Sequence, residues 1–317
     1  MPTKVFIDGS EGTTGLRLHK RLSAREDIEL LAIDSALRKD EAARAALSNN
    51  ADIVFLCLPD TAARAAVAGI TNPGVTVIDA STAHRVLDNW AYGLPELSPA
   101  HREKVETSSR ICVPGCHATG FNLLVYPLVT SGIAGADYPF TSHSVTGYSG
   151  GGKQVIAAYA ADGRPGYYTT PRQYALKQGH KHLPEMQKVS GLRYPPAFNP
   201  IIADFYSGMV VTVPLHLRLL GGSPDAKQLH SLFAAFYAGQ KLVSVAPWQA
   251  ESSLPETMLD PEHLSGRDDL EIFVCGNSER AILAARFDNL GKGASGAAIQ
   301  CMNISLGLPE ETGLKNN

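Results

Sequence analysis

Short apolar runs alternate with helix-like segments over the first third of the chain. The apolar runs cover residues 4–8, 28–34, 52–58, 75–79 and 110–113. Helix-like segments follow the first three of them, at residues 15–25, 40–47 and 61–70. Because this alternation indicates βαβ units with right-handed crossovers, we predict an α/β fold built on a doubly wound, Rossmann-type parallel sheet.

The pattern changes near residue 138. Longer strand candidates follow at residues 140–146, 209–220, 270–274 and 281–287, separated by long polar loops and one helix candidate at residues 225–238. This order predicts a second α+β domain with a mostly antiparallel sheet. We expect a last helix, residues 293–306, to return to the first domain. The predicted first domain is therefore residues 1–117 plus 290–317, and residues 118–289 form the predicted second domain.

Composition narrows the class of protein. Of 317 residues, 44% are hydrophobic, enough for a packed core, and the net charge of −3 gives no basic field for nucleic acid. No apolar run approaches the ~18 residues of a membrane span. The chain runs from Met1 directly into a strand pattern, so we expect no signal peptide. Five cysteines, an odd number in a long chain, fit a reducing cytoplasm.

A glycine-rich segment joins the first apolar run to the first helix. Gly9, Gly12 and Gly15 have G-x-x-G-x-x-G spacing, a variant of the dinucleotide fingerprint G-x-G-x-x-G. Glycines there allow a tight turn and let a pyrophosphate approach the helix N-terminus. A plain glycine turn is the alternative, and the βαβ context favours a cofactor.

The residues after the second apolar run bear on which nicotinamide cofactor binds. An acidic residue at its end, here Asp34, would hold the ribose hydroxyls of NAD, whereas a nearby arginine favours the 2′-phosphate of NADP. Ser35, Arg38 and Lys39 form a cluster suited to phosphate, and we expect NADP(H). The alternative is that Arg38 and Lys39 begin a solvated helix.

Cys116 lies where the apolar run 110–113 gives way to a helix-like run at residues 119–128. A thiol at a helix N-terminus meets unpaired N–H groups and the positive end of the helix dipole, and both favour the nucleophilic thiolate. A reactive cysteine in a dinucleotide-binding protein indicates hydride transfer to or from a thioester. The candidate acid/base partners are His117, His143, His180, His182 and His216.

His180 and His182 belong to the densest polar cluster in the second half of the chain. On an extended segment, this spacing points both imidazoles to one side. A metal could use such a pair, but no H-x-x-E-H or C-x-x-C completes a site, so we expect no metal. The neighbouring Lys181, Arg172 and Arg193 indicate an anion-binding pocket, and surface hydrogen bonding is the alternative.

Residues 147–154 nearly match the phosphate loop G-x-x-x-x-G-K-[ST], but Gln154 replaces the hydroxyl that holds Mg²⁺. We interpret the segment as a flexible glycine loop near the substrate, whose N–H groups could bind an oxyanion. Cys57, Cys112 and Cys301 lie in apolar segments and are predicted to be structural.

Four segments taken together resemble the short form of N-acetyl-γ-glutamyl-phosphate reductase, in the aspartate-semialdehyde dehydrogenase-like superfamily. They are residues 9–15, 114–120, 180–185 and 289–294, and the resemblance runs nearly end to end. Its most specific element is the Pro-Gly-Cys motif followed by Tyr126-Pro127. His117 stands where many members have an aromatic residue, and Cys112 where a small residue is usual. We expect neither to contact the nucleophile.

The resemblance implies NADPH-dependent reduction of N-acetyl-γ-glutamyl phosphate, a small-molecule acyl phosphate, to N-acetylglutamate 5-semialdehyde in arginine biosynthesis. Cys116 would attack the acyl phosphate, expel phosphate and form a thioester that accepts hydride. His182 is the favoured acid/base, with His180 second. The implied cofactor residues are Gly9, Ser10, Gly12, Thr13, Thr14, Gly15, Ser35, Arg38, Cys57, Pro59, Ser81, Asn289, Lys292 and Gly293. The implied substrate residues are Ser149, Gly150 and His180.

Two alternatives remain open. The chain could instead be an acyl-phosphate reductase of the aspartate-semialdehyde dehydrogenase type, which acts on aspartyl phosphate by the same chemistry. It could also be a non-catalytic dinucleotide-binding sensor, in which Cys116 is inert. An exposed sheet in the second domain would suit a symmetric homo-oligomer, either a dimer or a tetramer.

Overall fold

The computed structural model describes residues 1–316, and its chain divides into two compact units. The first unit contains Met1–Pro114 and Ala294–Leu314. The second contains Gly115–Gly293, together with Lys315 and Asn316. Among the residues that the structure describes, no helix is both long enough and apolar enough to cross a membrane.

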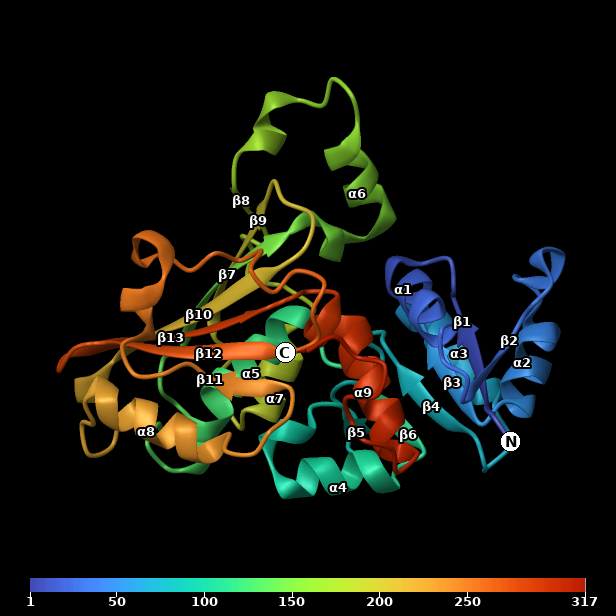
Figure 1. Ribbon diagram of the computed structural model, residues 1–317, viewed down its shortest axis with the longest axis horizontal. Helices are drawn as coiled ribbons and strands as arrows, with labels where there is room; N and C mark the ends of the chain where they lie inside the picture. The colour runs from blue at the N-terminus through green and yellow to red at the C-terminus, as the bar shows by residue number, and fades with distance from the viewer. Residues whose placement is uncertain (317) are drawn as a thin grey trace. The chain divides into compact units, whose positions relative to one another are not determined.

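The first unit is built on a six-stranded parallel sheet with strand order β2-β1-β3-β4-β6-β5 (Figure 1). Its strands are β1 (Thr3–Asp8), β2 (Ile28–Leu31), β3 (Ile53–Leu56), β4 (Thr76–Asp79), β5 (Ala91–Tyr92) and β6 (Arg110–Cys112). Its helices are α1 (Thr13–Leu22), α2 (Glu41–Asn50), α3 (Asp60–Gly69), α4 (Pro99–Thr107) and α9 (Gly296–Ser305). The strand order reverses direction between β1 and β3, the place where ligands bind in doubly wound sheets. This architecture confirms the predicted fold class.

The centre of this sheet is apolar on both faces. All four residues of β3 are buried, as expected for a parallel strand covered by helices on each side. One face packs Val5 and Phe55 with Leu18 of α1 and with Ala297 and Met302 of α9. Helix α2 packs on β1 and on α3. Helix α9, although late in the sequence, is therefore part of the first core.

Two elements of this unit were not predicted, and one strand was predicted too long. The run 28–34 pairs with β1 from Thr3↔Ile28 to Phe6↔Leu31 and no further, so β2 ends at Leu31 and Asp34 lies beyond the strand. The carboxylate of Asp34 instead accepts a hydrogen bond from the Ala36 N–H (2.8 Å) and caps a short 3₁₀ turn. Strand β5 has two residues, too few to show any alternation. Helix α4 buries only Val105, so its periodicity is weak.

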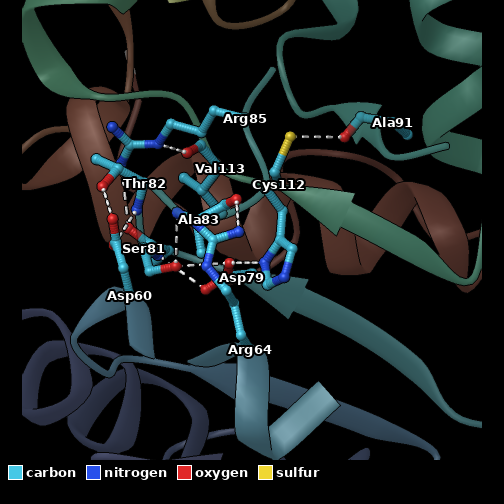
Figure 2. A network of polar contacts seen from close by, with 12 residues as sticks. Asp60, Arg64, Asp79, Ser81, Thr82, Ala83, Arg85, Ala91, Cys112 and Val113 are labelled. Carbon is cyan, nitrogen blue, oxygen red and sulfur yellow. Dashed lines mark hydrogen bonds and ion pairs between the residues drawn. The ribbon is translucent and has the colours of Figure 1, made fainter. Parts of the chain in front are cut away.

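A polar network orders the loop that follows β4 (Figure 2). The buried Asp79 carboxylate accepts hydrogen bonds from the Ser81 N–H (2.8 Å) and hydroxyl (2.7 Å), and lies 2.5 Å from His84 Nδ1. The N–H and hydroxyl groups of Thr82 donate to Asp60, the first residue of α3. Carboxylates from a strand and a helix thus hold this loop at the carboxyl edge of the sheet.

The second unit is built on a seven-stranded mixed sheet with order β11-β12-β13-β10-β7-β9-β8. Its strands are β7 (Thr141–Gly147), β8 (Arg172–Gln173), β9 (Ala197–Ala203), β10 (Met209–His216), β11 (Val243–Val245), β12 (Leu270–Gly276) and β13 (Arg280–Phe287). The pairs β11–β12 and β7–β9 are parallel, and the others are antiparallel. The register of the long central pair runs from Met209↔Phe287 to His216↔Arg280. The mostly antiparallel sheet was predicted correctly.

Helices pack on one face of this sheet. They are α5 (Cys116–Thr130) and α8 (Ala226–Phe236), and α7 (Leu183–Val189) packs on α5. Helix α5 approaches the sheet closely at Gly120, where a Cβ would lie 2.7 Å from Val211 Cβ. The Tyr237 hydroxyl, just after α8, donates to the Leu123 carbonyl at 2.6 Å and so joins α8 to α5.

Helix α6 (Gly152–Ala160) and helix α7 were not predicted. Helix α6 starts within the glycine loop and extends with the following segment beyond the sheet (Figure 1). The segment expected to be a flexible glycine loop is therefore an ordered 3₁₀ turn, Tyr148–Gly151, leading into a helix. Helix α7 has only seven residues, too few for a clear apolar period.

Candidate active site

Cys116 is the first residue of the long buried helix α5, and Gly115 is its N-cap. As a glycine, the N-cap residue has no side chain of its own to cap this end. The thiol is half-buried at a helix N-terminus, the setting predicted from the sequence. Gly115 is required there by packing, because an added Cβ would lie 2.5 Å from Cδ2 and Cε1 of His182.

The short helix α7 holds His182 against the start of α5. His182 is the N-cap residue of α7 and is buried. Glu185, in the first turn of α7, accepts a hydrogen bond from the Gly115 N–H at 3.1 Å. The backbone of Gly115 therefore contacts both the His182 imidazole and the buried Glu185 carboxylate, and both side chains come from the first turn of α7. This contact fixes the position of His182 relative to Cys116.

His117, His180 and His182 form a cluster of aromatic rings. The ring centroids of His180 and His182 are 4.7 Å apart, and His117 lies 5.4 Å from each. His182 is in a helical turn, not on an extended segment, so the predicted reason for their proximity is wrong. The rings meet because the His182 N–H donates to His180 Nδ1 (3.1 Å) across a local turn.

His117 contributes to the site more than the sequence indicated. Its Nδ1 lies 2.6 Å from the Ser144 hydroxyl, and its Nε2 lies 2.7 Å from the Tyr174 hydroxyl. Burial, helped by the nearby charges of His180 and Lys181, lowers the pKa of His117 to about 3. The ring is therefore neutral near pH 7.

The donor atoms of Cys116, His117 and His182 all lie within 4.8 Å of one another. The expectation that His117 does not contact the nucleophile stays a prediction, but its ring nitrogen belongs to the same cluster of donor atoms as the thiol. Cys116 and His117 come from a distant part of the sequence and lie near one member of the H-x-H pair, His182, a proximity that no sequence motif predicted.

Tyr174 is a further site residue that the sequence did not reveal. Burial raises the pKa of its hydroxyl, and the neighbouring charge of Cys116 raises it further. Its ring also lies 5.9 Å from that of His180. Tyr174 follows the two-residue strand β8, which gives no pattern from which its position could be predicted.

Three other candidates lie elsewhere in the second unit. His143 and His216 are exposed on strands β7 and β10, so the cluster of His117, His180 and His182 contains the bases nearest the thiol. The guanidinium of Arg172 lies over the rings of three tyrosines, the nearest 4.3 Å from its centroid. Cation–π contacts therefore occupy a side chain that was expected in an anion pocket.

The glycine-rich segments of the second unit meet one another. Asn289 Nδ2 donates to the Ser149 hydroxyl at 3.0 Å, and a Cβ at Gly150 would lie 3.0 Å from the same amide nitrogen. A Cβ at Gly293 would lie 2.8 Å from the Cβ of Cys116. Lys292 is fully buried. Ser149, Gly150 and Asn289 thus form one group, and Gly293 packs directly against the nucleophile.

In the first unit, the glycine loop has the shape that a pyrophosphate needs. Gly9 has φ of +90°, and its Cβ would lie 2.9 Å from the Cys57 carbonyl carbon. A Cβ at Gly15 would lie 2.8 Å from Ser10 Cα. Helix α1 has no acidic residue in its first turn, and Thr13 Oγ1 is buried there without a hydrogen-bond partner among the described residues. This donor-rich helix start fits a bound phosphate group.

The other first-unit candidates also lie after strands of the sheet. Cys57 follows β3, and burial raises the pKa of its thiol to about 12, which makes it a poor nucleophile. Pro59 is the N-cap of α3, and Ser81 belongs to the Asp79 network. Arg38 pairs with Glu11 of the glycine loop at 3.0 Å, beside a cavity of about 350 Å³. Ser35 begins the 3₁₀ turn that leads to Arg38.

The fold and the cysteine–histidine site define the semialdehyde dehydrogenase class. Residues 4–105 match the semialdehyde dehydrogenase NAD binding domain, and residues 116–289 match the semialdehyde dehydrogenase dimerisation domain. The aspartate semialdehyde dehydrogenase II of Vibrio cholerae has a similar fold, with a TM-score of 0.69 and 16% identity over 96% of this chain and 98% of that chain. The aspartate semialdehyde dehydrogenase of Candida albicans gives a TM-score of 0.64 at 14% identity, over 96% and 98% of the two chains.

Closer relatives carry a more specific name. N-acetyl-γ-glutamyl-phosphate reductase 2 of Nostoc sp. is 46% identical over 98% of this chain and 99% of its own length. The enzyme of the same name from Pseudomonas putida is 45% identical over 96% of both chains. The chain therefore belongs to the N-acetyl-γ-glutamyl-phosphate reductase branch of the semialdehyde dehydrogenase family.

Substitution of Gly115 by alanine tests whether His182 must lie on the helix start. We expect Gly115→Ala to lower kcat by about 10²-fold, because the added methyl group displaces the imidazole. His182→Asn should give a loss of the same size. The control is Gly179→Ala, in the loop that carries His180, where a Cβ would meet no atom within 4 Å. The measurement is the steady-state kcat of these three variants, of His180→Asn and of the wild type. A larger loss in His180→Asn than in His182→Asn would make His180 the acid/base instead of His182.

Proposed function

We propose that this protein reduces N-acetyl-γ-glutamyl phosphate to N-acetylglutamate 5-semialdehyde with NADPH, releasing phosphate, in arginine biosynthesis. The observation that carries the proposal is Cys116 at the first turn of α5, with donor atoms of His117 and His182 within 4.8 Å of its sulfur. Full-length similarity to relatives named for this activity supports the substrate. We assign the cofactor role to residues 1–117 and 290–317, and the substrate role to residues 118–289.

Cys116 is the nucleophile in this scheme. Its thiolate attacks the acyl carbon, the carbon–oxygen bond to phosphate breaks, and a thioester forms. N–H groups at the start of α5 stabilise the charge that develops on the carbonyl oxygen. Hydride addition to the thioester then gives a thiohemiacetal, and the carbon–sulfur bond breaks to release the aldehyde and restore the thiolate.

His182 is the proposed acid/base. Its ring lies against the Gly115 backbone and is held there by α7. It takes the thiol proton before attack, donates it to the oxygen when hydride adds to the thioester, and takes it back when the thiohemiacetal collapses. His117, neutral at pH 7 and bonded to two hydroxyls, positions its neighbours without exchanging protons with the substrate.

The cofactor proposal rests on the first unit. When bound, the reduced nicotinamide supplies the hydride. Gly9, Gly12 and the N-terminus of α1 would hold its pyrophosphate, and Ser35 with Arg38 would hold the 2′-phosphate of NADPH. The Arg38–Glu11 pair is solvent-exposed, so a doubly charged phosphate can compete with the Glu11 carboxylate for the guanidinium.

Aspartyl phosphate is a weaker candidate substrate. The aspartate semialdehyde dehydrogenases resemble this chain in fold at 16% identity or less, far below the relatives named for the acetylglutamyl substrate. A sensor without activity is disfavoured because such a protein needs no imidazole cluster around a half-buried thiol.

A reverse assay tests the activity and the role of Cys116 together. The wild-type protein should reduce NADP with N-acetylglutamate semialdehyde and phosphate, and much more slowly with aspartate semialdehyde. Cys116→Ser should lower turnover by at least about 10³-fold and leave NADPH binding, followed by fluorescence, unchanged. Cys275→Ser is the control, since that thiol lies on β12 and burial raises its pKa to about 12. Near-normal turnover in Cys116→Ser would end the covalent mechanism.

Arg38→Ala tests the preference for NADP. Loss of a charged hydrogen bond to the 2′-phosphate should raise KM for NADPH by about 10- to 100-fold and change KM for NADH little. Lys20→Ala, an exposed cation on α1, is the control and should change neither value. Equal changes for both cofactors in Arg38→Ala would remove Arg38 from the phosphate site.

We propose that a second copy of the chain covers the outer face of the seven-stranded sheet. Ile282, 48% exposed, pairs with Pro214 on this face beside a cavity of about 490 Å³ that is also lined by Tyr138 and Leu219. Residues 116–289 match a domain described as a dimerisation domain. Exposed apolar sheet surface of this kind is typical of an interface.

Ile282→Arg should therefore dissociate the assembly. Light scattering should give the wild-type protein a mass of at least twice the 33.8 kDa of one chain, and the variant the mass of one chain. Leu87→Arg, at an exposed position of the first unit, should keep the wild-type mass. A wild-type mass of 33.8 kDa would contradict the interface.

A further inference from the structure

The thiol and two imidazoles of the candidate active site form a set of metal-binding donors. Cys116 Sγ and one ring nitrogen from each of His117 and His182 lie within 4.8 Å of one another. Within residues 1–316, this is the one group of three or more histidine, cysteine or acidic side chains with that convergence. Both histidines are buried and Cys116 is half-buried.

The chemistry of the donors selects the metal. Thiolate and imidazole ligands favour Zn²⁺, whereas Mg²⁺ and Ca²⁺ require oxygen ligands. Three protein ligands with an open fourth position make a tetrahedral zinc site that retains one water. Tetrahedral zinc with thiolate and imidazole ligands places its donor atoms about 3.5 Å apart. The sulfur and the two ring nitrogens, within 4.8 Å of one another here, therefore need to move together by little more than 1 Å. Rotation about the Cα–Cβ bond of Cys116 supplies part of this movement.

Neighbouring hydroxyls can orient His117 as a ligand. Its two nitrogens contact Ser144 and Tyr174, so binding a metal costs one of these contacts and keeps the other. A metal-bound imidazole normally donates its second N–H to a fixed acceptor, which sets the ring orientation. Either hydroxyl can serve as that acceptor.

We propose that Cys116, His117 and His182 bind one Zn²⁺ ion, which reversibly blocks the nucleophile. On binding, the Cys116 thiol loses its proton, a sulfur–zinc bond forms, and one proton is released to solvent. No electron is transferred. The bound sulfur cannot attack an acyl carbon, so zinc inhibits, and a chelator that removes zinc restores the thiol. The binding step does not depend on the proposed reductase activity; only the inhibitory consequence rests on it.

Metal binding is measured on the full chain without reference to turnover. Titration of Zn²⁺ against a chromophoric chelator should show one tight equivalent per chain, and saturating Mg²⁺ should not displace it. Co²⁺ in place of Zn²⁺ should give a near-ultraviolet thiolate-to-cobalt band and intense visible bands typical of a tetrahedral ion. Zinc should also slow alkylation of Cys116, and a chelator should reverse this protection.

Matched variants identify the ligands. Cys116→Ser should abolish the thiolate-to-cobalt band, and His117→Phe should weaken zinc binding by at least about 100-fold, more than loss of an outer-shell contact would. His143→Phe makes the same substitution at an exposed histidine of β7 and should bind zinc like the wild type. If His117→Phe does not fold, as judged by circular dichroism, His117→Gln replaces it, because its amide can still bond to the hydroxyls.

The outcomes separate the two proposals. Absence of a tight zinc equivalent, a cobalt spectrum without the thiolate band, or unchanged binding in the His117 variant would each overturn the metal site. Failure of the reverse assay with a normal cobalt spectrum would remove the reductase proposal and leave the metal site standing.

Discussion

The packing of the His182 ring against the backbone of Gly115 is the contact on which the rest of the site depends. It is possible only because Gly115 lacks a Cβ, and it brings the start of α7 onto the start of α5. Glu185 then reaches the Gly115 N–H, so the same turn that positions the imidazole also satisfies a buried backbone donor. These two contacts of Gly115, with the His182 ring and with the Glu185 carboxylate, hold together two helix starts that are almost seventy residues apart in the sequence.

This arrangement sets two electrostatic influences against each other at Cys116. The N-terminus of α5 favours the thiolate, while the buried Glu185 carboxylate beside the Gly115 N–H opposes it. An imidazole that can accept the thiol proton therefore matters more here than at a helix N-terminus without an acidic neighbour. We propose that His182 accepts this proton, and that His117 does not, because burial lowers the pKa of His117 to about 3.

The sequence was sufficient to predict the parallel sheet, the glycine turn and the position of Cys116, because each is determined by residues close together in the chain. Apolar runs such as Ile53–Leu56 form whole strands, and the Pro-Gly-Cys motif contains the first residue of its helix. The sequence was not sufficient to predict the role of His117 or Tyr174. Their proximity depends on strand β8, two residues long, pairing with β9, and no local pattern encodes that pairing. Asp34 was assigned to a strand end because apolar residues continue past the last backbone pairing.

A buried imidazole must satisfy both ring nitrogens, and His117 does so with two hydroxyls instead of with charged groups. A carboxylate partner would raise its pKa and turn it into a second base close to the thiol. Hydroxyl partners supply no such charge, so burial keeps His117 neutral, and proton transfer is left to His182 in the scheme that we propose. The same neutrality that removes His117 from acid/base chemistry makes it suitable as a metal ligand. In both proposals for this thiol, acid/base catalysis and metal binding, His117 therefore acts as a buried, neutral imidazole held by Ser144 and Tyr174.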